Sequence, residues 1–467
     1  MFRHKSLVLL WKILAVHVLV LLSMLFFYSI QNFFPEELYR SKLKAAYAYG
    51  LIDTNAIERA PTGWGSDKAT ECLSLGMGLK KDLHLGDRLL NYYPSSTTTY
   101  NPCEGLVNWI QGNTEQYEFQ SYARYWHGHS EIIRWLVLIF GLPIARALLW
   151  LTMFTMLFAL YFVLKNTLST ISRRSNVISF IIISVYAFFV GLSDLHSSMT
   201  HLLSEISILG IALVAYKILR NGSSTRIILS GYGLGGAYVC TSYMINPQSI
   251  PTAILVWATI PIMVKTKDAI NILKNSIRFV SSLVIGYVLV WASKWVMISM
   301  LTPYDIWSEV KKQALHRSSH SVDSLSEGVS RHFIGFEEYP AFLRAIIANV
   351  GALVSKIYDP RYSTMFALGI YMLVLLLATI LFVILWKQKS ITKETFQALE
   401  ARFTLSLLLV WILSIFQVLI WYTFLTQHSF DHATYTYRSL VIPLSVLPLI
   451  LTAIVNTRLS TTKGNSI

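Results

Sequence analysis

Apolar runs of about twenty residues recur along this chain, and they constrain its fold more than any other feature. Each run is long enough to cross a hydrocarbon core of about 30 Å as a helix. Of the 467 residues, 54% are hydrophobic and 14% are charged, whereas a soluble domain carries roughly 25% charged residues. We therefore expect an all-α polytopic membrane protein rather than a series of soluble domains.

About ten such runs are candidate transmembrane helices. The first covers about 8–29, behind a basic N-terminal segment without a signal-peptide cleavage pattern, so we expect a retained helix. The other nine lie near 134–164, 177–193, 203–219, 227–245, 250–265, 279–300, 362–386, 403–425 and 439–456.

These helices divide the chain into five parts. Residues 1–29 hold the first helix, 30–130 a large loop domain, 131–300 spans two to seven, 301–361 a second large loop, and 362–467 the last three spans and a tail. Within the second loop, the stretch YPAFLRAIIANVGALVSKI has helical apolar spacing, which is typical of a helix along the membrane surface.

The formal net charge of +14 is distributed in a way that indicates topology rather than nucleic-acid binding. Short clusters of Lys and Arg lie in every second connection between spans, for example at Arg173–Arg174, Lys265–Lys267 and Lys387–Lys389. The positive-inside rule places such connections in the cytoplasm. Both termini are then cytoplasmic, and the two large loops are extracytoplasmic.

Two of the three cysteines lie in the first large loop. Cys72 and Cys103 can form a disulfide if that loop faces an oxidising compartment. Cys240 lies within an apolar run, where a cysteine behaves as a small buried hydrophobe.

Acidic residues of the first loop form one candidate catalytic group. Asp67 and Glu71 are four residues apart and would share one face of a helix. Paired carboxylates can deprotonate an acceptor hydroxyl or hold a divalent cation. The alternative is a helix start with Ser66 as N-cap and acids in the first turn, and spacing alone favours this alternative because such patterns are common.

A second candidate group directly precedes the second span. Arg124, Tyr125, Trp126 and His127 can together bind a phosphate and stack on a sugar ring. The alternative is an aromatic belt at the lipid headgroups, which accounts for the two aromatic residues better than for the arginine and histidine.

A third group lies between the last two spans. His428 and His432 are four residues apart with Asp431 between them, but a closed zinc site needs more ligands, and solvated interfacial histidines are the commoner case. Arg438, beside Tyr437, is a candidate anion contact at the mouth of the last span.

Smaller polar features lie elsewhere. Asp194, His196 and His201 form a turn that is either functional or only solvated, and Lys294 and Arg331 are either anion partners or side chains that reach toward the interface. The stretch GYGLGG at 231–236 resembles a nucleotide-binding string, but it lies inside a span and lacks a preceding strand, so we expect it to allow close helix packing.

Four short pieces together resemble the GT-C superfamily of multi-span bacterial membrane glycosyltransferases. They are Asp67-x-x-Thr70-Glu71, Arg124–Gly128, Ser193-Asp194, and His428-x-x-x-His432 with Tyr437-Arg438. The order of elements is also similar: one helix, a large outward loop bearing acids, then a many-helix bundle. The Asp pair that this family carries directly after the first span is matched only approximately, by Glu36-Glu37.

The resemblance implies a GT-C-like fold in the bacterial inner membrane and a polyprenyl-phosphate-sugar donor. It implies a glycan or lipid acceptor, contact with membrane lipids, no nucleic acid, and no cofactor beyond a possible divalent cation. An acid of the first outward loop then serves as base, Asp67 first and Glu71 second. The implied substrate-binding residues are Arg124, Tyr125, Trp126, His127, Asp194, His428, His432, Tyr437 and Arg438.

Other functions share much of this pattern. A transporter or flippase for a lipid-linked saccharide would bury ionisable residues in its spans and often show two related halves. The predicted spans are almost free of acids and no inverted repeat is visible, which argues against an ion-coupled transporter. A polymerase or ligase of envelope polysaccharide would show the same features as the glycosyltransferase, and a non-enzymatic scaffold would leave the polar groups without a role.

Overall fold

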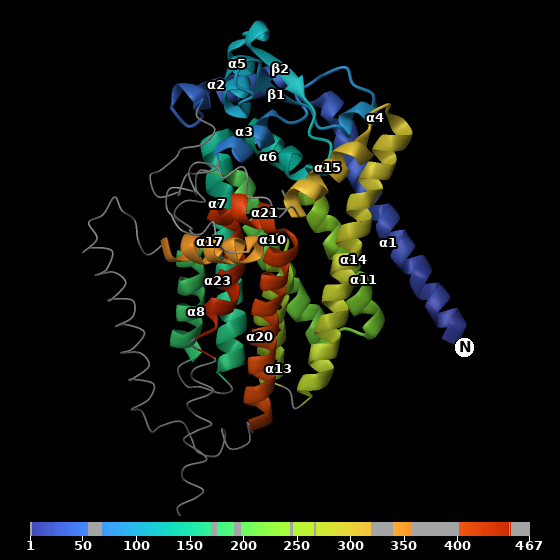
Figure 1. The fold of residues 1–467 in the computed structure, drawn as a ribbon, viewed down its shortest axis with the longest axis vertical. Helices are drawn as coiled ribbons and strands as arrows, with labels where there is room; N and C mark the ends of the chain where they lie inside the picture. Colours follow the sequence, from blue (N-terminus) through green and yellow to red (C-terminus); the bar gives the residue numbers. More distant parts are fainter. Residues whose placement is uncertain are drawn as a thin grey trace, which may run out of the picture.

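The computed structural model describes residues 2–54, 68–169, 175–190, 198–242, 246–265, 268–318, 340–355, 401–447 and 449. These residues form an all-α membrane protein with one two-stranded sheet. Figure 1 shows long helices running side by side, with a small domain at the end drawn at the top. We call this the upper end; α1 ends there and α10 begins there.

Five of the described helices are long and apolar enough to cross a membrane. They are α1 (Phe2–Ile30), α7 (Leu142–Leu168), α10 (Met199–Asn221), α14 (Ala269–Leu301) and α20 (Ala401–Phe424). The window of α10 is 61% buried, against 11% in α1, so α10 occupies the interior of the bundle and α1 its periphery. The prediction of a helical membrane protein is confirmed.

The remaining predicted spans are shorter or interrupted. The run at 134–164 forms two helices, α6 (Gly128–Phe140) and α7, because Gly141 takes a positive φ of 77° between them and Pro143 follows at the start of α7. The run at 177–193 forms α8 (Ser175–Phe189), which has 15 residues. The run at 362–386 lies outside the described residues.

Two further predicted spans keep their helical character. The run at 227–245 forms α11 (Ser224–Thr241), and the run at 250–265 forms α12 (Ser249–Ala253), the π-helical segment η3 (Ile254–Thr259) and α13 (Ile260–Lys265). Every residue of η3 is buried, so this segment lies in the centre of the bundle.

Glycines allow α11 and α14 to pack closely. A Cβ atom at Gly231 would collide with Phe279 O, at Gly235 with Leu283 O, and at Gly286 with Tyr232 O. The GYGLGG stretch therefore serves helix packing, as its place inside an apolar run predicts. Cys240, near the upper end of α11, is buried and not disulfide-bonded, also as predicted.

The upper domain is built from short elements of the first large loop. These are α2 (Glu36–Ala48), α3 (Lys68–Gly76), α4 (Leu85–Arg88), β1 (Tyr93–Ser96), α5 (Pro102–Gln111), η2 (Thr114–Gln116) and β2 (Tyr117–Gln120). The two strands are antiparallel, with Tyr93 opposite Gln120 and Ser96 opposite Tyr117.

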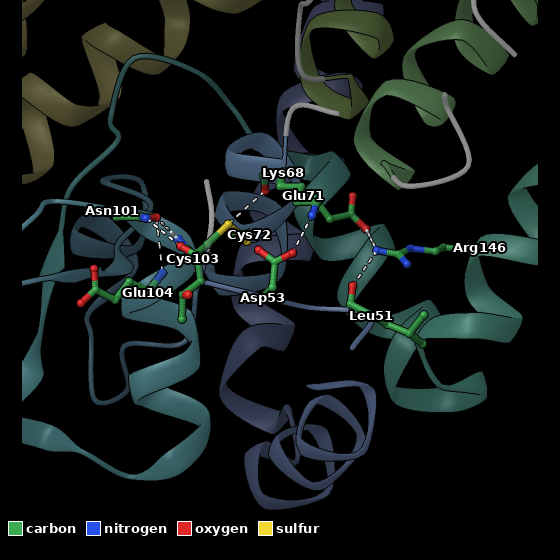
Figure 2. Close-up of a disulfide and its surroundings, with 10 residues drawn as sticks. Leu51, Asp53, Lys68, Glu71, Cys72, Asn101, Cys103, Glu104 and Arg146 are labelled. Atoms are coloured by element: carbon green, nitrogen blue, oxygen red, sulfur yellow. Dashed lines mark hydrogen bonds and ion pairs between the residues drawn. A yellow bond between two sulfur atoms is a disulfide. The ribbon is translucent and has the colours of Figure 1, made fainter. Parts of the chain in front are cut away.

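Helix α5 shows how local sequence fixes this domain. The Asn101 side chain caps it by accepting hydrogen bonds from the main-chain N–H groups of Cys103 and Glu104 at 2.8 and 3.3 Å. Pro102 is its first residue, and Gly112 ends it with a φ of 81°. Cys103 in α5 is joined to Cys72 in α3, with Cα atoms 5.0 Å apart (Figure 2), so the predicted disulfide is present.

Short helices complete the upper end. They are α15 (Ile306–Ser318), α17 (Ala341–Ser355), α21 (Thr426–Asp431), α22 (Ala433–Thr436) and α23 (Arg438–Ser445). Figure 1 shows α17 running across the long helices, the direction expected of a segment along the membrane surface. Helix α21 packs against both α15 and α17.

Candidate functional site

Of the two predicted catalytic carboxylates, the structure describes only one. Asp67 lies outside the described residues. Glu71 lies in α3 and is 4% exposed; its Oε2 accepts a hydrogen bond of 2.7 Å from the main-chain N–H of Met199, the first residue of α10. Its Oε1 lies 3.6 Å from Nη2 of Arg146, which also donates to Leu51 O (Figure 2).

These contacts make Glu71 an anchor between the upper domain and the bundle. A carboxylate at a helix N-terminus satisfies main-chain donors and interacts favourably with the helix dipole. Burial raises the pKa of Glu71, while Arg146 and the main-chain donors of α10 act in the opposite direction. The acid thus stands at the start of α10 with Oε2 hydrogen-bonded and Oε1 in an ion pair with Arg146.

The predicted group Arg124–His127, which we call the RYWH turn, is held by its main-chain carbonyls. Arg124 O accepts from the indole N–H groups of Trp291 at 2.6 Å and Trp295 at 3.0 Å. Tyr125 O accepts from Lys294, and Trp126 O accepts from the Tyr28 hydroxyl. Helices α1 and α14 therefore fix three successive carbonyls.

Side chains of the RYWH turn are also packed. Trp126 is 0% exposed and donates from Nε1 to Val290 O at 2.8 Å. The Tyr125 ring stacks on Trp291, with centroids 5.6 Å apart. Arg124 lies 3.4 Å from Glu309 of α15. These contacts make the turn a structural joint between α1, α14 and α15, and none of them tests the substrate-binding or the aromatic-belt interpretation of the sequence.

His127 ends the turn in the left-handed region, with a φ of 55°. Its ring lies 4.9 Å from the ring of Tyr122 and 5.4 Å from that of His129. Burial, His129 and Lys294 hold the pKa of His127 well below its usual range, and burial lowers the pKa of His129 to about 3. Both rings are therefore neutral at pH 7, and a non-glycine residue in this conformation is a costly arrangement that the fold must enforce.

A second polar region lies beside α10 and contains the third predicted group. Arg438 of α23 donates to His201 Nδ1 at 3.0 Å. The His201 ring lies 5.5 Å from that of Tyr435, which stacks on His432 at 5.0 Å, and His432 lies 4.7 Å from His428. A continuous row of rings thus runs from α10 through α22 to α21.

Arg317 of α15 connects this row to the RYWH turn. Its guanidinium lies 5.6 Å from the ring centroid of Tyr125, and it is close enough to His428 to act on it electrostatically. Burial, His432 and Arg317 hold the pKa of His428 well below its usual range, so this ring is also neutral at pH 7. We call the set His201, Arg317, His428, His432, Tyr435 and Arg438 the arginine–histidine cluster.

Charge in the arginine–histidine cluster is unbalanced. Within the described part of the chain, neither Arg317 nor Arg438 forms an ion pair with a carboxylate, although Arg438 is only 8% exposed. Arg438 acts electrostatically on Glu205 of α10, which accepts a 2.8 Å hydrogen bond from Tyr186. Because a buried cation without a paired anion is costly, this arrangement is suited to an anionic ligand.

Two residues of this region were not singled out by the sequence analysis. Arg317 lies in a predicted loop among other basic residues and carries no distinguishing pattern. Glu205 is an acid inside the predicted span 203–219, and an ionisable residue in a span is itself a functional signal. The spans are therefore less free of functional acids than their composition suggests.

Two other predictions are addressed only in part. Asp194 and His196 lie outside the described residues, and Tyr437 is 1% exposed beside Arg438. Across the described ranges, no three His, Cys, Asp or Glu side chains gather as they would around a metal ion. The rings of His428 and His432 are neighbours, but no third side chain that could bind a metal ion lies beside them in the described residues.

Comparison with known proteins found no matching protein-family model, no matching curated protein and no matching solved structure.

Proposed function

We propose that this chain is a membrane glycosyltransferase of the GT-C type, which transfers a sugar from a polyprenyl phosphate to a cell-envelope glycan or lipid. One observation carries the proposal: Arg317 and Arg438, from separate helices, approach one row of histidine and tyrosine rings without an ion-paired carboxylate in the described residues. A leaving prenyl phosphate needs such cations, and the surrounding apolar helices suit its chain.

The proposed topology has ten spans with both termini in the cytoplasm of a bacterial cell. The upper end then faces outward, and the arginine–histidine cluster lies at the level of the lipid phosphates in the outer leaflet. Two features support this orientation: the basic connections between spans and the Cys72–Cys103 disulfide in the upper domain.

In the proposed reaction, a hydroxyl oxygen of the acceptor attacks the anomeric carbon of the donor sugar. The bond from that carbon to the phosphate oxygen breaks, and the released prenyl phosphate keeps the electron pair. Arg317 and Arg438 stabilise its charge. A carboxylate takes the hydroxyl proton, and we assign this task to Asp67, because Glu71 is engaged by Arg146 and the start of α10.

The experiment is mass spectrometry of envelope glycans and glycolipids from source cells. Wild type is compared with a deletion and with Asp67→Asn and Arg438→Met at matched protein level. Arg226→Met is the control, because Arg226 is exposed at the first turn of α11, at the opposite end of the bundle. Loss of one defined sugar in the deletion and both site variants, but not in the control, is the expected result.

A transporter for a lipid-linked saccharide is the second candidate, and Glu205 favours it, because this buried acid lies within a span near Arg438. The same comparison separates the two functions. Transport predicts accumulation of the intact precursor in the deletion and in Arg438→Met, with normal glycans in Asp67→Asn. Unchanged glycans in the deletion would refute both functions.

A further inference from the structure

Three buried polar residues follow one another closely in the chain where α12 begins, and none of them belongs to the groups described above. Asn246 is 1% exposed, and Gln248 and Ser249 are each 2% exposed. Both polar atoms of each amide and the Ser249 hydroxyl lack a hydrogen-bond partner within the described part of the structure. We call these three residues the amide group.

Such an arrangement needs an explanation, because native proteins pair nearly all buried polar atoms. Each buried amide left unpaired costs free energy that folding has to supply from elsewhere. The main chain here is hydrogen-bonded: Ser249 N–H donates to Asn246 O at 2.9 Å, and Gln248 O accepts from Gln417 at 2.7 Å. The backbone is thus fixed, while the side chains of Gln248 and Ser249 remain available and that of Asn246 faces Glu205.

The amide group adjoins the arginine–histidine cluster. Helix α12 packs between α10, α20 and α23. The Asn246 amide approaches the carboxylate of Glu205 without making a well-formed hydrogen bond, and Glu205 lies within electrostatic range of Arg438. A ligand whose phosphate meets Arg438 therefore has the amide group close to its next chemical unit.

We propose that the amide group is the sugar subsite for the lipid-linked donor and that it selects an uncharged, hydroxyl-rich sugar; this rests on the proposed function. Asn and Gln side chains each offer a donor and an acceptor, and Ser offers both in one atom, which matches the two roles of a sugar hydroxyl. No side chain of the amide group carries a charge. A uronic acid would bring its carboxylate into a subsite whose own three side chains offer no cation to pair with it.

The test measures binding to the full chain in lipid nanodiscs by native mass spectrometry. The probes are undecaprenyl phosphate, its neutral glucosyl, galactosyl and mannosyl derivatives, and its glucuronosyl derivative. For wild type we expect at least one neutral derivative to bind at least tenfold more tightly than undecaprenyl phosphate itself. The glucuronosyl derivative should bind no more tightly than undecaprenyl phosphate.

The decisive variant is Asn246→Leu combined with Gln248→Met, which keeps volume and removes the unpaired amides. We expect it to lose the tenfold preference and to keep the affinity for undecaprenyl phosphate. Its unfolding midpoint should stay level or rise by a few degrees, because buried unpaired polar atoms are removed. Asn166→Leu is the control, since Asn166 is exposed at the opposite end of α7.

The outcomes separate the two claims. If wild type binds undecaprenyl phosphate but no neutral sugar improves binding, the sugar subsite is wrong while the proposed function stands. The sugar subsite is also wrong if the double variant weakens all probes equally, or keeps the preference. If wild type binds none of the lipid phosphates, the proposed function itself fails. A lowered midpoint in the double variant would show that the amides stabilise the fold, and it too would overturn the inference.

Discussion

The RYWH turn and the arginine–histidine cluster contain similar residue types but differ in how their polar atoms are used. In the turn, three successive carbonyls accept hydrogen bonds from α1 and α14, and Arg124 faces Glu309. In the cluster, two arginines lack carboxylate partners in the described residues, and His428 Nδ1 is buried with no hydrogen bond. Bonded main-chain carbonyls and a carboxylate partner for the arginine, rather than residue type, distinguish the joint from the candidate site.

Trp126→Ala tests the structural half of this comparison and should have the largest effect. Trp126 is fully buried and donates to Val290 O, so its removal leaves a cavity and takes away a buried hydrogen bond. We expect a loss of about 3–5 kcal/mol in the free energy of unfolding. Thermal unfolding in detergent, followed by a signal other than tryptophan fluorescence, measures it.

His428→Gln is the matched variant in the cluster. Its Nδ1 makes no hydrogen bond to lose, so we expect the free energy of unfolding to change by about 1 kcal/mol or less. If His428→Gln is as damaging to stability as Trp126→Ala, the distinction between joint and site is wrong.

Removing the Cys72–Cys103 disulfide tests whether the stability of the RYWH turn and of the arginine–histidine cluster depends on the upper domain. Cys72 lies next to Glu71, which anchors α3 on α10, and the bridge closes a separation of 31 residues. Replacing both cysteines by serine should cost about 2–4 kcal/mol. Limited proteolysis should then cut the upper domain first, while cutting that begins in the long helices would contradict the anchoring role of Glu71.

Acid should weaken the joint through its neutral histidines. Burial lowers the pKa of His129 to about 3. Between pH 6.5 and 3, His129 is therefore protonated in the unfolded protein and neutral in the folded protein. The contribution of neutral His129 to the free energy of unfolding is therefore fully present above pH 6.5 and is lost as pH falls. His129 alone should account for about 2 kcal/mol between pH 7 and pH 5.

His129→Gln isolates this contribution, because glutamine retains a partner for Ser74 and does not titrate. Its unfolding midpoint should depend less on pH than that of wild type over the same interval. Equal pH profiles for the two proteins would show that His129 is not the group responsible.

Glu309→Gln should have the smallest effect. The ion pair of Glu309 with Arg124 is partly exposed, so its loss should cost less than about 1 kcal/mol. Thermal unfolding at low and high salt checks this value; a larger, salt-independent loss would show that the pair is central to the RYWH turn rather than peripheral.

The sequence predicted the membrane-protein class and several local features, because each has a short-range cause. Apolar runs dictate spanning helices, Cys72 and Cys103 lie in one loop, and the glycines of 231–236 lie on one helix. Asn101, Pro102 and Gly112, which begin and end α5, form a local pattern that the sequence analysis did not single out. The break at Gly141 was within reach of the same reasoning, since Gly-Leu-Pro interrupts a helix.

The candidate site was harder to predict because it is assembled from distant segments. His201 and Arg438 are 237 residues apart in the chain, and nothing local indicates that they touch. Glu71 looked like one member of a carboxylate pair, and only the fold reveals Met199 and Arg146 as its partners. The amides of 246–249 appeared to be an ordinary connection, since burial and pairing of side chains are tertiary properties.

The hydrogen bond from Trp126 to Val290 also has a consequence for the order of assembly. Its two residues are 164 positions apart. At a synthesis rate of about 5–20 residues per second, α14 appears roughly 10–30 s after the turn that it completes. Until then the Trp126 indole and the carbonyls of Arg124 and Tyr125 lack their partners in α14, whereas Trp126 O already has Tyr28 of α1, and Cys72 and Cys103 have both been synthesised. The Cys72–Cys103 crosslink is thus available to hold the first loop together before its docking partner exists.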